Sequence, residues 1–307
     1  MRPGPHLFLA FVLAVCASAF PPRSLCATEV TLVPVAENIY RFEGTMANCV
    51  AFVGPDGVLI ADSGEGAELG EAMMSALRTV SDKPIEYLVN THHHFDHVSG
   101  NAVFGRAGAK IIAQENLRDI CTSQARWPEV ALPPEGMPSI CFKDSLTLHL
   151  NGEEVLIFHP ETGGAHTDND AVLFFRHANV LYTGDLLCNG MYPYIDASHR
   201  GWAQGMAESC RMVLALIDEN TIVIPGHGKV CDRRALEQNV AMLADVGGKV
   251  AAMMKEGLSQ EQIRQAKPSA AWDAEFSRDY IKAFGKGTSP DEFVDMVYNA
   301  LKARDTE

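Results

Sequence analysis

Residues 91–97, THHHFDH, place four histidines and one aspartate within seven positions. They follow IEYLVN, a short apolar run after Pro84 that predicts a buried strand, so the histidines begin where a strand ends. Crowded imidazoles repel one another as they take up protons, and they are poor core residues without partners. A chain with this segment must therefore fold so that something holds these side chains in place.

The rest of the chain alternates between strand and helix patterns. Apolar runs around Gly-Pro-Asp-Gly predict a hairpin over residues 48–64, and helical spacing predicts a helix over residues 67–80. Further strands are predicted at 110–114, 145–150, 153–160, 171–177, 180–184 and 221–228, and further helices at 115–124 and 202–217. From residue 232 the pattern is almost wholly helical, with breaks near 268 and at 285–287. We expect one catalytic domain at residues 20–245 and a helical C-terminal extension at 246–307.

Two metal ions would explain the histidine segment. His92 and His94 can face one ion from a strand end, while Asp96 and His97 can turn toward a neighbouring ion. Two coordination spheres need further ligands, and three strand ends or glycine-rich turns offer them: GGAHTD at 163–168, YTGD at 182–185 and PGHG at 225–228. The alternative, a solvated polar loop, requires four imidazoles and a carboxylate to occur together by chance.

In chain order, HxHxDH, a histidine, an aspartate and Gly-His resemble the metallo-β-lactamase superfamily of binuclear metallohydrolases, over roughly residues 30–245. The resemblance implies an α/β fold, an αβ/βα sandwich of two mixed β-sheets flanked by helices, with metals in a cleft along one edge. By position it implies that His92, His94 and His166 hold one metal, that Asp96, His97 and His227 hold another, and that Asp185 bridges both. His93 is left over, and strand-like alternation would point it away from the metals, as a supporting or an exposed residue.

This resemblance also implies a chemistry. We expect two divalent metal ions, with zinc as the leading candidate, and water bound to such ions loses a proton near neutral pH. The resulting nucleophile would attack an ester, lactone, thioester or amide-like bond of a small molecule. Asp96 is the expected catalytic residue, because it could orient this nucleophile or move its proton, and Asp62 is expected to support the metal loop.

The bridging position separates branches of the superfamily. It resembles a cysteine or serine in the best-known antibiotic-hydrolysing branches, whereas this chain has Asp185, and Cys188 stands where a carboxylate-binding lysine would be. We therefore disfavour a dedicated β-lactamase and keep weak, promiscuous lactam opening as an alternative. The aspartate looks more like the branch of glyoxalase II, lactonases and arylsulfatase-like members, although no glutathione-binding basic cluster is matched. Two further hypotheses are a mononuclear iron enzyme like the persulfide dioxygenases and a non-catalytic metal-binding protein.

Residues 188–202, CNGMYPYIDASHRGW, resemble exported bacterial members of the superfamily whose natural substrates are mostly unassigned. Tyr192, Tyr194, His199 and Arg200 are candidates to line a substrate pocket, with Arg200 available for an anionic group. An ordered loop whose aromatic side chains merely pack is an equal alternative. The Pro-rich residues 126–138 similarly could form a lid or structural padding.

The N-terminal segment predicts export. Residues 7–19, LFLAFVLAVCASA, are too short to span a bilayer comfortably and end in Ala-Ser-Ala, which predicts a signal peptide at 1–19 and a periplasmic protein without stable membrane insertion. Its removal leaves 24 Lys and Arg against 39 Asp and Glu, a formal charge of −15, and this disfavours nucleic acid as a partner. Oligomeric state stays open. Cys121 and Cys141 could pair or remain separate thiols.

Overall fold

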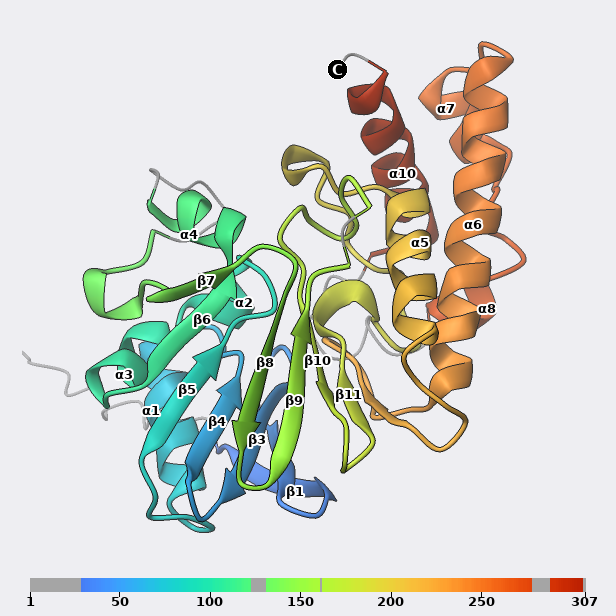
Figure 1. The fold of residues 1–307 in the computed structure, drawn as a ribbon. Coiled ribbons are helices and arrows are strands. Elements are labelled where there is room, and N and C mark those ends of the chain that lie inside the picture. Colours follow the sequence, from blue (N-terminus) through green and yellow to red (C-terminus); the bar gives the residue numbers. More distant parts are fainter. Residues whose placement is uncertain (1–28, 123–130, 161, 278–287, 306–307) are drawn as a thin grey trace, which may run out of the picture.

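Two mixed β-sheets face each other, and helices cover the outer face of each sheet (Figure 1). The structure is a computed structural model, and it describes residues 29–122, 131–160, 162–277 and 288–305. The expected signal peptide at residues 1–19 and the glycine-rich turn at 285–287 lie outside the described residues, so export to the periplasm stays a prediction. The expected αβ/βα sandwich is confirmed.

The first sheet contains seven strands whose order follows the chain. They are β1 (Thr31–Ala36), β2 (Ile39–Glu43), β3 (Cys49–Gly54), β4 (Gly57–Ala61), β5 (Ile85–Val89), β6 (Lys110–Gln114) and β7 (Ile140–Phe142). The pairs from β1 to β4 are antiparallel and the pairs from β4 to β7 are parallel. Parallel neighbours need a crossover, and α1 (Ala67–Leu77) provides the one between β4 and β5.

The second sheet has the strand order β12-β11-β10-β9-β8. Its strands are β8 (Ser145–Leu150), β9 (Glu153–Phe158), β10 (Val172–Phe175), β11 (Val180–Tyr182) and β12 (Ile222–Ile224). Strands β8 to β11 pair antiparallel, whereas β11 and β12 pair parallel across the helix α5 (Ala203–Leu214). The ends of β11 and β12 therefore meet at the same edge of this sheet.

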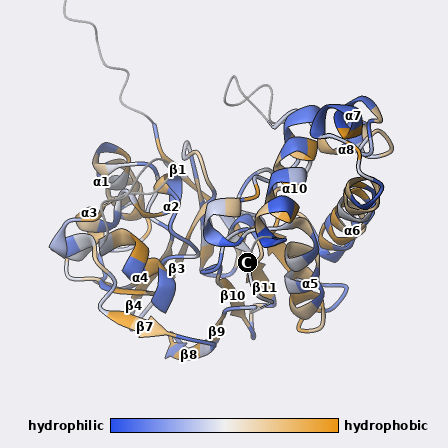
Figure 2. Cartoon of the chain, turned by 90° about the horizontal axis from the view of Figure 1, so that it is seen from above, coloured by the Kyte–Doolittle hydropathy of each residue, from blue (hydrophilic) through white to orange (hydrophobic). Residues whose placement is uncertain are grey.

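Helices form the two outer layers. Figure 2 shows α1 and α3 on one side of the strands and α5 and α6 on the other. The remaining elements are α2 (Phe95–Val98), α3 (Asn101–Arg106), α4 (Glu115–Thr122), α6 (Arg233–Lys255), α7 (Gln260–Gln265), α8 (Asp273–Phe276) and α10 (Pro290–Arg304), with short 3₁₀ turns η1 (Pro134–Gly136), η2 (Gly184–Leu186) and η3 (Ala197–His199). Ser259 and Ser289 begin α7 and α10 with capping boxes, which satisfy backbone N–H groups at these helix starts.

Alternation along the strands separates the core into layers. In β3, Val50 and Phe52 face the second sheet, whereas Cys49 and Ala51 face α1 and α3. Because both faces of these strands are buried, their sequences are continuous apolar runs. Between the sheets, the rings of Phe52 and Phe175 meet edge to face with centroids 5.4 Å apart.

Most predicted elements form, with shorter ends than the sequence patterns suggested. The helix predicted over residues 67–80 ends at Leu77, and the strand predicted over 171–177 is Val172–Phe175. The expected boundary at 245/246 falls inside the continuous helix α6, whose buried residues share one core cluster with α10 and the second sheet. Cys141 is a free thiol, so no disulfide joins it to Cys121.

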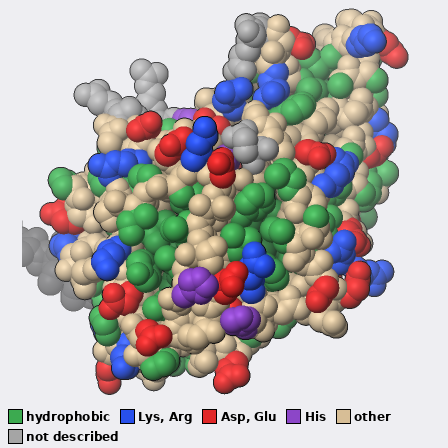
Figure 3. Space-filling view, viewed as in Figure 1, with side chains coloured by type: hydrophobic (Ala, Val, Ile, Leu, Met, Phe, Trp, Pro, Cys, Tyr) green, Lys and Arg blue, Asp and Glu red, His purple; other side chains and the backbone are tan. Residues whose placement is uncertain are grey.

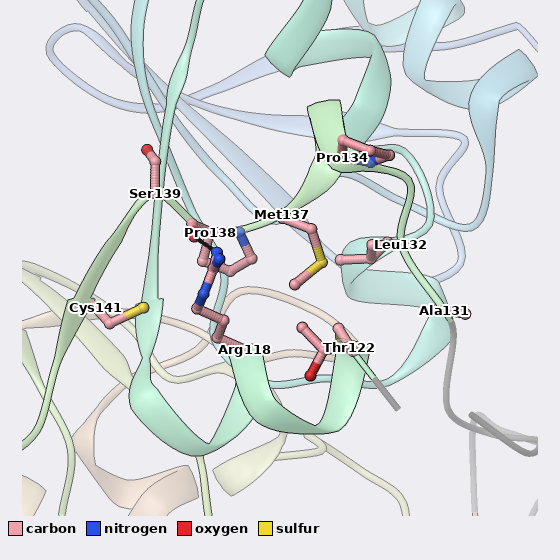
Figure 4. Close-up of a pocket in the computed structure, with 10 residues that line it drawn as sticks. Arg118, Thr122, Ala131, Leu132, Pro134, Met137, Pro138, Ser139 and Cys141 are labelled. Atoms are coloured by element: carbon pink, nitrogen blue, oxygen red, sulfur yellow. Dashed lines mark hydrogen bonds between the residues drawn. The ribbon is translucent and has the colours of Figure 1, made fainter. Parts of the chain in front are cut away.

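A cavity of about 850 Å³ lies between α4 and the segment before β7 (Figure 4). Arg118 reaches across it and donates a hydrogen bond to the carbonyl of Pro138, beside Leu132 and Met137. The described part of the Pro-rich stretch expected to form a lid or padding lines this cavity, while residues 126–130 lie outside the described residues. Its described lining includes none of the seven residues expected to bind metal.

The face of the molecule seen in Figure 1 carries charged side chains of both signs (Figure 3). Figure 3 shows acidic and basic side chains spread around the face seen in Figure 1, with apolar side chains gathered toward its middle. Although the net charge of the chain is −14, the described residues on this face form no uniformly acidic patch. No helix in the described part of the chain is long and apolar enough to cross a membrane.

The packing between the two sheets should contribute to the free energy of unfolding, and one substitution can test this. Phe175 has no exposed surface, and its ring packs on Phe52, so Phe175→Ala should lower the free energy of unfolding by about 3–5 kcal/mol through lost burial and a cavity. Val80→Ala, at a side chain that is 40% exposed, is the control and should change it by less than about 0.5 kcal/mol. Denaturant titration followed by circular dichroism measures both, and equal small losses would contradict the packing described.

Candidate metal centre

The structure brings all seven residues that were expected to bind metal to one place. His92 and His94 follow β5, and Asp96 and His97 lie in the first turn of α2. His166 lies between β9 and β10, Asp185 lies in η2 after β11, and His227 follows β12. The site therefore joins strand ends from both sheets. All seven side chains are buried, and His227, at 9% exposure, is the least buried of them.

Three imidazole nitrogens form the first group. His94 Nδ1 lies 3.0 Å from both His92 Nε2 and His166 Nε2, and these two Nε2 atoms are 3.3 Å apart. Nitrogens bound tetrahedrally to one zinc ion would be about 3.3 Å apart, given the usual zinc–nitrogen distance. Asp185 Oδ2 completes the group, 3.7 Å from His166 Nε2 and 3.9 Å from His92 Nε2.

Asp96, His97 and His227 form the second group. Asp96 Oδ2 lies 3.4 Å from His227 Nε2 and 3.8 Å from His97 Nε2. Asp185 lies beside this group as well, because its Oδ1 is 3.3 Å from His97 Nε2 and its Oδ2 is 3.3 Å from His227 Nε2. One carboxylate therefore adjoins both groups.

Unpaired buried atoms show that this donor set fits metal ions. His97 Nε2 and Asp185 Oδ1 are buried without a hydrogen-bond partner among the described residues, although they face each other at 3.3 Å. Burying polar atoms without partners is costly, and a cation beside them would satisfy both. Imidazole and carboxylate together are ligands of zinc, iron and other divalent metals. The arrangement therefore fits divalent metal binding.

The two groups differ in their electrostatics. Burial, followed by the neighbouring His94, lowers the pKa of His166 to about 4, which favours the neutral ring that a metal needs. Burial also acts to lower the pKa of His227, but the carboxylates of Asp185 and Asp96 outweigh it and raise that pKa to about 10. Metal binding at the second group must consequently displace a proton that these carboxylates otherwise retain.

Asp62 lies behind the second group and is hydrogen-bonded to His97. Its Oδ2 accepts hydrogen bonds from His97 Nδ1 at 2.7 Å, the Thr91 hydroxyl at 2.7 Å and the Tyr182 hydroxyl at 2.6 Å. The backbone N–H of Thr91 donates to its Oδ1 at 2.8 Å. A carboxylate on the far nitrogen of a histidine fixes the ring so that the other nitrogen faces the metal. Asp62 is thus a positioning residue for His97.

Gly226 shows how closely the backbone approaches Asp185. A Cβ atom at Gly226 would lie 2.0 Å from Asp185 Oδ1, so any side chain there would collide with this carboxylate. The N–H of Gly226 donates instead to the carbonyls of Gly184 and Leu187, which ties the His227 turn to the Asp185 turn. Gly226 is therefore required by space at this position.

The other sequence candidates lie in different surroundings. Tyr194 is 44% exposed, and its ring lies edge-on to His94 with centroids 5.7 Å apart. Tyr192 is buried in the core instead, His199 binds Asp196, and Arg200 is exposed with a left-handed backbone at φ 62°. His93 stands outside both groups and is buried, so the suggestion that it could be exposed is wrong.

Asp196 is the residue that the sequence reasoning missed. It is buried, and its Oδ2 accepts hydrogen bonds from His94 Nε2 at 3.1 Å and from His199 Nδ1 at 2.7 Å. One local signal pointed to it. An aspartate two residues before a serine often accepts that residue's backbone N–H, as Asp196 does from Ser198. That signal predicts a turn, and it says nothing of the distant His94.

Comparisons with known proteins agree with this geometry. A model of the metallo-beta-lactamase superfamily matches residues 43–227. A linear primary-alkylsulfatase of Pseudomonas sp. is 37% identical over 76 residues, 23% of this chain and 14% of that protein. Hydroxyacylglutathione hydrolase of Pelagibacter ubique is 30% identical over 114 residues, 36% of this chain and 41% of that protein. The chain thus covers less than half of these relatives' lengths.

Among solved structures, a stereoselective inverting sec-alkylsulfatase from Pseudomonas sp. has a similar fold. Its TM-score is 0.67 at 18% identity, and the match covers 88% of this chain and 50% of that one. At this identity the likeness concerns the fold alone. It extends over more of the chain than the 43–227 match of the family model.

Asp62 provides a test of how the site is supported. Asp62→Asn keeps the size of the side chain but leaves buried donors of Thr91, His97 and Tyr182 short of an acceptor, so it should cost about 2–4 kcal/mol of stability. Asp56→Asn, at an exposed turn, is the matched control and should cost less than about 0.5 kcal/mol. Chelator-treated protein is used in denaturant titrations, and equal losses in the two variants would contradict the role of Asp62.

Proposed function

The chain belongs to the metallo-β-lactamase superfamily, and on that premise we propose that it is a metal-dependent hydrolase with a dinuclear centre. His92, His94 and His166 would hold one ion, Asp96, His97 and His227 would hold the other, and Asp185 would contact both. Zinc is the proposed metal, because these imidazole and carboxylate ligands suit it. The substrate is proposed to be a small molecule.

The position of Asp185 is the observation that carries this proposal. Its Oδ1 lies 3.3 Å from His97 Nε2, and its Oδ2 lies 3.3 Å from His227 Nε2. The same Oδ2 lies 3.7 Å from His166 Nε2 and 3.9 Å from His92 Nε2. A structural zinc site is usually closed by four ligands and needs no second group beside it. A complete second group likewise argues against a mononuclear iron enzyme of the persulfide dioxygenase type.

The residues of the site have separable tasks. Divalent ions, when bound, lower the pKa of water and polarise the bond under attack. Asp96 is the proposed catalytic residue, because its carboxylate lies 3.4 Å from His227 Nε2 within the second group and can accept and move a proton there. Tyr194 is proposed to contact the substrate, which its 44% exposure beside His94 supports, whereas Tyr192 is buried.

The bond that is cleaved is proposed as a class. We propose an ester, lactone, thioester or amide-like bond, because each has an electrophilic centre that a metal-activated water can attack. The likeness to a linear primary-alkylsulfatase and to a hydroxyacylglutathione hydrolase adds alkyl sulfate esters and acyl-glutathione compounds to the substrates worth screening. Weak opening of β-lactams belongs on the same panel.

Metal content tests the centre itself. Protein purified without added metal or chelator should contain about two zinc ions per chain by elemental mass spectrometry. Treatment with a strong chelator should remove both ions together with any hydrolysis on the panel, and added Zn²⁺ should restore it. About one iron per chain would contradict the proposal and favour oxygen chemistry.

Asp185 tests whether the two groups act together. Asp185→Asn retains the shape of the side chain but loses the charge that adjoins both groups, so turnover of the best substrate on the panel should fall about 100-fold or more. Zinc content should fall as well. Asp56→Asn is again the control, with turnover within about twofold of the unchanged protein. Unchanged turnover in Asp185→Asn would exclude the dinuclear mechanism.

A further inference from the structure

One short segment contacts histidines of the first group on the ring nitrogens that face away from that group. Residues 192–196, YPYID, accept hydrogen bonds from two of its three histidines. His94 Nε2 donates to Asp196 Oδ2 at 3.1 Å, and His166 Nδ1 donates to the backbone carbonyl of Tyr194 at 2.8 Å. In each ring this leaves the other nitrogen to face the first group. The tautomer and orientation of both rings therefore depend on the YPYID segment.

Asp196 is bound on both of its oxygens. Its Oδ2 accepts from His199 Nδ1 at 2.7 Å as well as from His94, and it lies 3.6 Å from His93 Nε2. Its Oδ1 accepts the backbone N–H of Ser198 at 3.0 Å. The side chain is 1% exposed, so these contacts fix the carboxylate in a single orientation. A carboxylate held this way can in turn hold His94.

The segment is also joined to the backbone around His166. The N–H of Asp196 donates to the carbonyl of His166 at 3.1 Å, and the N–H of Gly201 donates to the carbonyl of Asp196 at 2.7 Å. The segment is therefore hydrogen-bonded both to the ring of His166 and to its backbone.

The C-terminal helices hold the start of this segment. The ring of Tyr192 stacks on Phe293 of α10 with centroids 4.5 Å apart and on Phe276 of α8 at 5.7 Å. Its hydroxyl donates to Asp273 Oδ1 at 2.7 Å, and its backbone N–H donates to the carbonyl of Phe276 at 2.9 Å. Figure 1 shows α8 and α10 within the helical layer of the second sheet.

A second contact from α10 reaches the same region. Arg304 donates from Nη1 to the carbonyl of Gly163 at 3.0 Å, three residues before His166, and its guanidinium lies 4.1 Å from the centre of the Trp202 ring. The last described helix of the chain therefore touches the His166 loop directly as well as through Tyr192.

We propose that Asp196 is the positioning residue of the first group and that α8 and α10 hold it in place through Tyr192. This rests on the metal centre of the proposed function. The second group has separate support, because His97 is held by Asp62. Loss of Asp196 should thus weaken one metal site and leave the other intact.

Asp196→Asn is the first variant. An asparagine keeps the size but offers one oxygen, without charge, to donors from His94 and His199, so affinity for one of the two Zn²⁺ ions should fall about 10- to 100-fold. Competition with a chromophoric chelator measures each affinity. Protein loaded with Co²⁺ instead should show altered visible absorption bands for one ion and unchanged bands for the other, which a general loss of stability would not produce.

Tyr192 variants test the link to the helices. Tyr192→Phe keeps the stacking and loses the hydroxyl contact with Asp273, so its Zn²⁺ affinity should change by about threefold or less. Tyr192→Ala loses both, and the same site that Asp196→Asn weakens should weaken by about tenfold or more. Tyr87→Phe, in the first sheet, is the control. If Tyr192→Ala does not fold, Arg304→Ala replaces it and should weaken that site as well.

The outcomes separate this inference from the proposed function. Unchanged protein that binds no zinc would overturn the metal centre. The inference alone would be overturned if the wild-type protein binds two Zn²⁺ ions and the Asp196→Asn variant binds both with the same affinities. The Co²⁺ absorption bands of the variant would then also match those of the wild type. His93, His94 and Asp196 also lie close enough to hold an ion of their own. A third ion in the unchanged protein, lost in Asp196→Asn while two others bind unaltered, would contradict the positioning role as well.

Discussion

The buried carboxylate of Asp62 is the contact on which the site depends. It lies directly after β4, binds Thr91 after β5, and accepts a hydrogen bond from Tyr182 at the end of β11. It thereby joins both sheets at the edge where the ligands gather, and it also orients His97. A charge buried this completely is costly without several donors, so the sheets must meet in the observed register for Asp62 to be satisfied. The fold and the metal centre are stabilised by the same hydrogen bonds.

The two groups differ in how many carboxylates they contain, and this difference affects how each would attract a metal ion. The first group is mostly imidazole, and burial favours the neutral rings that bind metal. At the second group the carboxylates of Asp185 and Asp96 outweigh burial and raise the pKa values of His97 and His227. These carboxylates would attract a cation for the same reason that they retain protons.

Sequence reasoning selected the seven candidate metal-binding residues because each lies at or shortly after a strand end, and local patterns mark strand ends well. It predicted both the HxHxDH segment and the downstream turns, and the structure brings these residues together. It did not predict β1, β2, β7 or the helices that begin at Phe95 and Asn101, and of these β7 and the two helices are short. It also placed Tyr192 at a substrate pocket. An aromatic residue in a glycine- and proline-bearing loop gives no local sign that Phe276 and Phe293, far along the chain, will cover it.

The same limit applies to the boundary that was expected after residue 245. The helical pattern begins at residue 232, and α6 runs without a break from Arg233 to Lys255. Its apolar face continues the core of the second sheet across residues 245 and 246. Residues beyond the boundary then return to the site, since Asp273 and Phe293 fix Tyr192, and Arg304 binds the carbonyl of Gly163. Contacts of such long sequence separation leave no periodic pattern in the chain. The C-terminal helices thus pack on the second sheet and also contact the segments that hold His94 and His166.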